Sequence, residues 1–122
     1  MSKKPSSVHY NEYLDLDKIL DAQHPLSKGN NNEAHEEMLF IIIHQTYELW
    51  FKQIIHEINS VIHLLSKEKM DEENVGIVVG RFDRVSKILD VLVQQLDILE
   101  TMTALDFLDF RNYLSPASGF QS

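Results

Sequence analysis

Apolar residues repeat at helical spacing along most of the chain, and no segment alternates as a strand would. No glycine or proline interrupts the sequence from Glu33 to about Ser66, which predicts one long helix there. Two stripes lie side by side on this helix, a pattern that indicates two buried faces and therefore a central helix. The first contains Phe40, Ile43, Tyr47, Trp50, Ile54, Val61 and Leu64, and the second contains Phe51, Ile55, Ile58, Ile62 and Leu65.

A second long helix is predicted from Asp71, which is placed to cap it, to about Glu100. Thr103 and Asp106 then have the spacing of a capping box, and the shorter helix they begin should end before Pro116. Apolar residues of the second helix recur at alternating steps of three and four, a heptad seam that favours packing against a partner helix. The seam is Val75, Val78, Phe82, Val85, Leu89, Leu92, Leu96 and Leu99.

The N-terminal part is more polar. Residues 1–9 carry no apolar run, Tyr13 to Ala22 predicts a short helix, and Ser27 to Asn32 has the composition of a loop. We expect an N-terminal arm over residues 1–32 and the helical core of a single domain over residues 33–122.

The expected fold is all-α, with long antiparallel helices forming part of a helical bundle. At 1.5 Å per residue the first long helix would span roughly 50 Å. A compact domain of this size has a diameter of only about 35 Å. We therefore expect the bundle to be completed by C-terminal helices that this chain lacks, by neighbouring subunits, or by both.

Composition excludes several classes of function. Eleven Lys and Arg stand against nineteen Asp and Glu, so the net charge is −8 and no basic face is available for nucleic acid. Cysteine is absent, which rules out disulfides and thiolate-bound metals. No signal peptide and no apolar run of about 18 residues is present, so we expect a cytoplasmic protein that does not enter membranes.

Six histidines are many for 122 residues, but their spacing matches neither the zinc-protease helix nor the di-iron bundle motif. His44 differs from the others because it lies in the most apolar part of the chain, with Phe40 one turn before it and Phe51 two turns after it. The pattern alone favours a satisfied core histidine. The alternative is a histidine that lines an aromatic pocket and hydrogen-bonds a planar ligand.

Arg111 is the second candidate, since it follows Phe107 by four residues on an otherwise apolar helix. An arginine in such surroundings needs an anion. That anion is either an internal carboxylate, such as Asp106 or Glu48, or the carboxylate of a ligand held by two hydrogen bonds. Tyr10 and Tyr13 are interpreted as packing anchors, and the small residues from Ser115 to Gly119 as a loop without a ligand.

These residues lie in five strings that look like the signatures of tryptophan 2,3-dioxygenases. The strings occur in the family's order and cover nearly the whole chain, which therefore resembles the N-terminal part of that family. They are Tyr10–Leu16, Ala34–Gln45, Tyr47–Gln53, Leu99–Phe107 and Phe110–Ser122.

The resemblance implies an all-helical homotetramer with heme b as cofactor. Such an enzyme inserts both atoms of O2 into the indole C2–C3 bond of L-tryptophan and forms N-formyl-kynurenine, which begins tryptophan catabolism by the kynurenine route. His44 matches the distal histidine that hydrogen-bonds the indole N–H and is the expected catalytic residue. Arg111 matches the arginine that pairs with the substrate carboxylate. For His44 the resemblance replaces the interpretation as a core histidine, and for Arg111 it favours a ligand carboxylate as the partner.

The remaining site residues follow from the same resemblance. Phe40 and Phe107 match the aromatic walls of the indole pocket, and Leu114 matches an apolar pocket residue. Ser118 and Gly119 match the loop against the distal face of the heme. Tyr10, Tyr13 and Leu14 match residues that reach into a neighbouring subunit's pocket.

One departure from the family pattern matters for activity. The family's iron-ligating histidine and the threonine that binds the substrate ammonium both lie downstream of Ser122. We therefore expect the substrate side of the pocket in this chain and the iron ligand elsewhere. The alternative function is a catalytically inactive helical oligomerisation fragment without heme.

Overall fold

The computed structural model describes residues 8–30 and 32–114. All of the regular secondary structure in these residues is helical, and no strand occurs among them. The expectation of an all-α fold is therefore confirmed. The predicted loop over residues 115–122, which contains Ser118 and Gly119, lies outside the described residues. Among the described helices, none is both long enough and apolar enough to cross a membrane.

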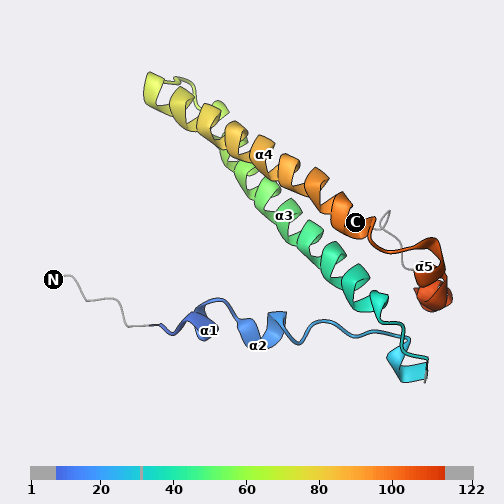
Figure 1. Cartoon of the computed structure of the whole chain (residues 1–122). Coiled ribbons are helices and arrows are strands. Elements are labelled where there is room, and N and C mark those ends of the chain that lie inside the picture. The colour runs from blue at the N-terminus through green and yellow to red at the C-terminus, as the bar shows by residue number, and fades with distance from the viewer. Residues whose placement is uncertain (1–7, 31, 115–122) are drawn as a thin grey trace.

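Two long helices, α3 (Glu36–Leu65) and α4 (Glu72–Leu99), form an elongated antiparallel hairpin (Figure 1). Their ends fall close to the predicted ones. The Asp71 side chain accepts a hydrogen bond from the Asn74 backbone N–H at 2.8 Å, so the predicted cap of α4 is confirmed. Satisfying this N–H, which no helical carbonyl can reach, stabilises the first turn.

The α3–α4 interface buries the first predicted stripe of α3 for most of its length. Val61, Leu64 and Val78 form a buried cluster, against which Met70 packs from the turn between the helices. Further along, Ile43, Ile88 and Leu92 are also buried. Removing these side chains from water is the main stabilising contribution to the hairpin.

The seam predicted on α4 is correct for only half of its positions. Val78, Val85, Leu92 and Leu99 are buried or half-buried, whereas Val75, Phe82, Leu89 and Leu96 remain about half exposed. The side of α4 that faces α3 is turned by one residue from the predicted seam, and polar groups also take part in the interface. Thr46 donates to the Gln95 side chain at 3.0 Å, and the Tyr47 hydroxyl donates to the Leu92 carbonyl at 2.7 Å.

The second stripe of α3 was expected to be buried, and in the described residues it is exposed. Each residue of this stripe comes one position after a residue of α3 that faces α4. In the same way, each of the four exposed residues of α4 comes one position after a residue that faces α3. Since the helices are antiparallel, a turn by one residue in the same sense brings both sets to one side of the hairpin. This apolar face comprises Phe51, Ile55, Ile58, Ile62 and Leu65 of α3 with Val75, Phe82, Leu89 and Leu96 of α4.

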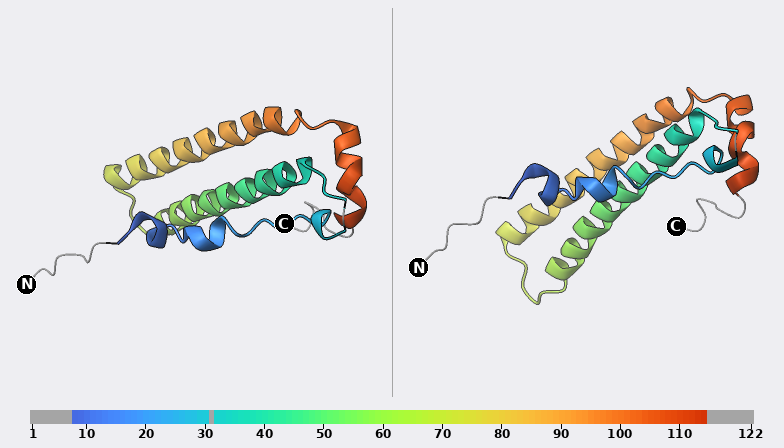
Figure 2. Two further views of the ribbon diagram at one scale, coloured as in Figure 1. Left: turned by 60° about the horizontal axis from the view of Figure 1, so that its bottom comes forward. Right: turned by 90° about the horizontal axis from the view of Figure 1, so that it is seen from below.

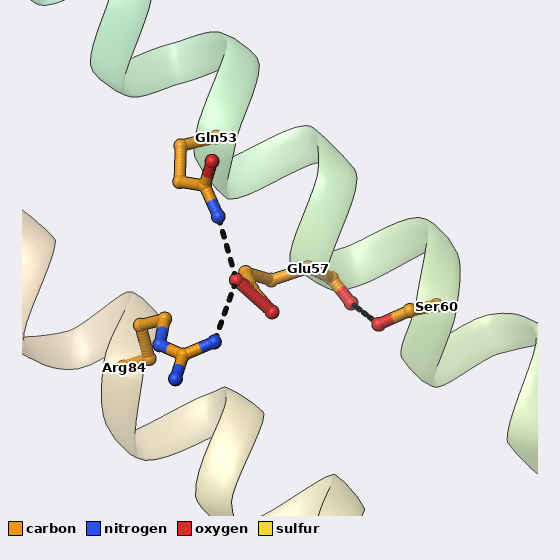
Figure 3. Close-up of polar contacts among 4 residues, drawn as sticks. All are labelled: Gln53, Glu57, Ser60 and Arg84. Atoms are coloured by element: carbon orange, nitrogen blue, oxygen red, sulfur yellow. Dashed lines mark hydrogen bonds and ion pairs between the residues drawn. The ribbon is translucent and has the colours of Figure 1, made fainter. Parts of the chain in front are cut away.

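A buried carboxylate interrupts the first stripe between Ile54 and Val61. Glu57 accepts a hydrogen bond from the Gln53 side chain at 2.7 Å and forms an ion pair with Arg84 of α4 at 3.2 Å (Figure 3). Burial alone would raise the pKa of Glu57. The hydrogen bonds from Arg84 and Gln53 outweigh that effect and hold the pKa below its ordinary value.

The N-terminal part differs from the single helix predicted over Tyr13–Ala22. Two short helices occur instead, α1 (Tyr10–Tyr13) and α2 (Leu16–Ile19), separated at Asp15, whose φ of 57° is left-handed. A helix cannot continue through that conformation. The 3-10 turn η1 (Lys28–Asn30) lies within the predicted loop. We call residues 8–30 the arm. Its part from Ala22 to Ser27 is hydrogen-bonded to α3, and the chain diverges from α3 toward the N-terminus (Figure 1 and Figure 2).

Candidate functional site

Four aromatic rings gather where α5 (Ala104–Arg111) crosses the N-terminal end of α3. The ring of Phe40 lies 4.2 Å from that of His44, 5.8 Å from that of Phe107 and 5.4 Å from that of Phe110, measured between centroids. Phe107 and Phe110 meet edge to face at 5.4 Å. The edge-to-face contacts that Phe110 makes with Phe40 and with Phe107 have a favourable geometry for aromatic rings. We call these four residues the aromatic cluster.

The capping box predicted at α5 is confirmed and holds this helix at its start. The Thr103 hydroxyl accepts from the Asp106 backbone N–H at 3.1 Å, and the Asp106 carboxylate accepts from the Thr103 backbone N–H at 3.0 Å. The hydrogen bond that the carboxylate receives from the Thr103 backbone, and a smaller contribution from the Thr103 side chain, lower the pKa of Asp106. Phe110, one turn further on, is fully buried and anchors α5 on α3.

His44 is exposed, so the core interpretation favoured by the pattern alone is wrong. Its ring lies on that of Phe40, and its Nδ1 is 2.7 Å from the Phe40 carbonyl oxygen. A carbonyl oxygen only accepts, so Nδ1 carries the proton in this contact. In the neutral ring Nε2 is then an acceptor. The geometry therefore prepares His44 to accept a hydrogen bond from an N–H group.

Beside His44 lies an apolar hollow between the arm and α3. Its walls are contributed by Ile19 and Ala22 of the arm and by His44, Gln45, Glu48 and Leu49 of α3. An apolar hollow with a few polar groups at its rim is the usual form of a small-molecule site.

Arg111 is the last residue of α5, and its side chain is exposed. Within the described part of the chain its guanidinium has no ion-pair partner. The internal alternatives are not realised, since the Asp106 carboxylate is engaged by Thr103 and no contact joins Arg111 to Glu48. Arg111 shares a helix face with Phe107, four residues earlier, which belongs to the aromatic cluster. Leu114, in the 3-10 turn η2 (Asn112–Leu114), is half-buried.

The structure does not bring the other expected pocket residues to His44. Tyr10, Tyr13 and Leu14 are exposed at the far end of the arm, and among the described helices α1 packs only against α2. Ser118 and Gly119 lie outside the described residues. The sites of these five residues therefore stay predictions.

Two residues beside the site were missed from the sequence. Glu37 is buried and accepts hydrogen bonds from the backbone N–H groups of Leu26 and Ser27, and Gln45 donates to the Ala22 carbonyl. Both hold the arm. The sequence pattern did not single out Glu37, because an acidic residue in the first turn of a helix is ordinary and needs no special partner.

Comparison with known proteins decides the family. A family model described as tryptophan 2,3-dioxygenase matches residues 1–122. The chain belongs to this family. The resemblance read from the five strings is therefore confirmed.

Three tryptophan 2,3-dioxygenases show how close the similarity is. The chain is 55% identical to that of Bdellovibrio bacteriovorus over 115 residues, 57% identical to that of Aedes aegypti over 113, and 56% identical to that of Dictyostelium discoideum over 115. These alignments cover 94%, 93% and 94% of this chain, but only 32%, 29% and 29% of the respective relatives. The chain thus spans about a third of the length of the curated tryptophan 2,3-dioxygenases it matches.

A heme needs an axial ligand and an apolar slot for the macrocycle. Among the described residues no group of three or more metal-ligating side chains gathers, and the two residues expected against the heme lie beyond Leu114. His44 contributes one imidazole. Its geometry suits a hydrogen bond to a bound ligand as well as it suits coordination of a heme iron. The described residues of this tryptophan 2,3-dioxygenase chain do not by themselves make a heme site.

Proposed function

We propose that this chain supplies the substrate side of a heme-dependent dioxygenase that opens the indole ring of L-tryptophan. Both atoms of O2 enter the product, N-formyl-kynurenine, and the indole C2–C3 bond breaks, so the reaction consumes no other reductant. Heme b, held by the complete protein, supplies the activation of O2. The residues of this chain bind and orient the amino acid.

The observation that carries the proposal is the hydrogen bonding of the two ring nitrogens of His44. Its Nδ1–H is engaged by the Phe40 carbonyl at 2.7 Å, which leaves Nε2 to accept the indole N–H. The phenylalanines of the aromatic cluster offer ring faces and edges to a planar substrate. A hydrogen bond at one end and aromatic walls at the side fix the indole in one orientation, which lowers the entropic part of the barrier.

Arg111 supplies the second point of attachment. Its guanidinium, without a carboxylate partner in the described residues, suits a bidentate pair with the substrate carboxylate. Leu114, three residues beyond the end of α5, adds an apolar contact. Ser118 and Gly119 are proposed to lie against the heme, and Tyr10, Tyr13 and Leu14 to enter the pocket of a neighbouring subunit in a cytoplasmic homotetramer.

Substitution of Arg111 tests the proposal in the complete heme-loaded enzyme. Arg111→Ala should raise the KM for tryptophan by about a hundredfold, since a charge-assisted bidentate pair contributes roughly 3 kcal/mol. Indole, which has no carboxylate, provides the matched control ligand, and its affinity should be the same in both proteins. An unchanged KM for tryptophan contradicts the assigned role.

A further inference from the structure

The arm is fastened to α3 by a buried carboxylate. Glu37 is 1% exposed, and its two oxygens each accept a backbone N–H of the arm, from Leu26 and from Ser27, both at 2.9 Å. The Ser27 hydroxyl, itself fully buried, accepts the Ala34 N–H at 3.0 Å. Both oxygens of the side chain thus act as acceptors, and neither is left without a partner in this buried place. We call this arrangement the Glu37 clamp.

A second attachment lies eight residues further along α3. Gln45 donates to the Ala22 carbonyl at 2.8 Å and accepts from the Gln23 side chain at 2.9 Å. Eight helical residues rise about 12 Å. The four residue-to-residue steps from Ala22 to Leu26 reach about 13 Å when extended. The segment between the attachments is therefore held against α3 at both of its ends.

The held segment adjoins one wall of the hollow beside His44. Two residues of the arm line that hollow: Ala22, the first residue of the segment, and Ile19, three residues before it. Glu37 itself does not line the hollow and belongs to neither the aromatic cluster nor the Arg111 end of α5. Its effect on the hollow must therefore pass through the arm.

We propose that Glu37 is a positioning residue for substrate binding: by clamping Leu26 and Ser27 it holds Ile19 and Ala22 as the wall of the hollow beside His44. This inference rests on the proposed function, because it takes the hollow as part of the tryptophan site. Release of the clamp leaves the chemistry intact and opens one wall. The loss appears in KM, whereas kcat changes little.

The test compares Glu37→Gln with Glu36→Gln in the complete heme-loaded enzyme. Gln at position 37 keeps the shape of the side chain but turns an amide N–H toward one of the two backbone donors. Glu36→Gln removes the same charge one residue away, from a carboxylate that accepts neither the Leu26 nor the Ser27 N–H. Ser27→Ala is the milder second variant, since it removes only the bond from Ala34 and keeps the fold should Glu37→Gln fail to assemble.

Two readouts are measured: hydrogen exchange of the arm amides, and KM and kcat for tryptophan. Glu37→Gln should speed exchange at Leu26 and Ser27 by about tenfold or more and raise KM by about fivefold, with kcat within about twofold. Ser27→Ala should change both in the same direction by less. Exchange within α3 and α4 should be unchanged in every variant, as should both readouts in Glu36→Gln.

Unchanged arm exchange in Glu37→Gln overturns the clamp. Faster exchange with an unchanged KM overturns the positioning role, as does an equal rise of KM in Glu36→Gln. Failure of the proposed function looks different, because the unsubstituted enzyme would then not turn over tryptophan at all. Arm exchange in Glu37→Gln would still decide whether Glu37 holds the arm.

Discussion

Arg84 of α4 reaches across the helical hairpin to Glu57 of α3, with 3.2 Å between Nη1 and Oε2. The two side chains lie in unequal surroundings, since that of Glu57 is 4% exposed and that of Arg84 is 62% exposed. The Gln53 amide completes the environment of the carboxylate (Figure 3). A slip of either helix by one residue would separate the buried carboxylate from Arg84, its partner across the hairpin, which opposes any other register.

The acid sensitivity of the hairpin follows from this pair. The pKa of folded Glu57 lies below its ordinary value of 4.5, so its contribution to stability is present above that pH and is lost as the pH falls through the lowered pKa. Glu57→Gln should therefore flatten the decline of the unfolding free energy below pH 4.5. Urea unfolding at a series of pH values measures this. Arg84→Gln removes the partner instead and should also flatten the decline, whereas a full acid dependence in Glu57→Gln would refute the assignment.

The two leucines that end α3 form a matched pair for the packing of the core. Leu64 is 9% exposed in the cluster with Val61 and Val78, and Leu65 is 53% exposed on the apolar face. Leu64→Ala should lower the unfolding free energy by roughly 2–4 kcal/mol, because it removes apolar contacts and leaves a cavity. Leu65→Ala should cost about 0.5 kcal/mol or less in this chain. Equal losses in urea unfolding would show that the hairpin packs differently.

The capping box should determine how firmly α5 is held. Thr103→Ala removes the acceptor for the Asp106 N–H and should destabilise the start of α5 by about 1 kcal/mol. Exchange of the Asp106 amide should then be about fivefold faster. Thr101→Ala is the control, since the Thr101 hydroxyl donates to the Ile98 carbonyl within the end of α4. Protection of Asp106 that is unaffected by Thr103→Ala would refute this role.

His44→Ala tests whether His44 serves the substrate or the iron. In the complete enzyme this variant should lose about tenfold to a hundredfold in turnover, as expected when a positioned hydrogen bond is removed. It should keep its heme, because the proposed role does not include ligation. The Soret absorbance of the purified variant measures heme content. Complete loss of heme would contradict the substrate role and assign His44 to the metal.

Helix boundaries and caps were predictable from the sequence because their causes are local. Asp71 and Thr103 lie next to the backbone N–H groups they satisfy, so spacing alone reveals them. Apolar residues at steps of three and four likewise reveal which segments become helices. Asp15 was not predictable, since a left-handed residue in an otherwise helical stretch has no compositional signal in the segment Tyr13–Ala22.

The residues of the candidate site divide in the same way. His44, Phe40, Phe107 and Arg111 were identified by sequence, through strings shared with the family. Glu37 and Gln45 were missed because their partners, Leu26, Ser27 and Ala22, contribute backbone atoms that carry no sequence signature.

The sequence by itself determined the helical class, the ends of the long helices, the caps at Asp71 and Thr103, and the family, all of which depend on residues near one another or on ordered strings. Only the tertiary structure decided which side of α4 faces α3, which stripe of α3 remains exposed, and whether Arg111 has an internal partner. It also decided that His44 is exposed rather than buried. Each depends on the rotation of one helix about its axis against another, and side chains distant in sequence set that rotation together.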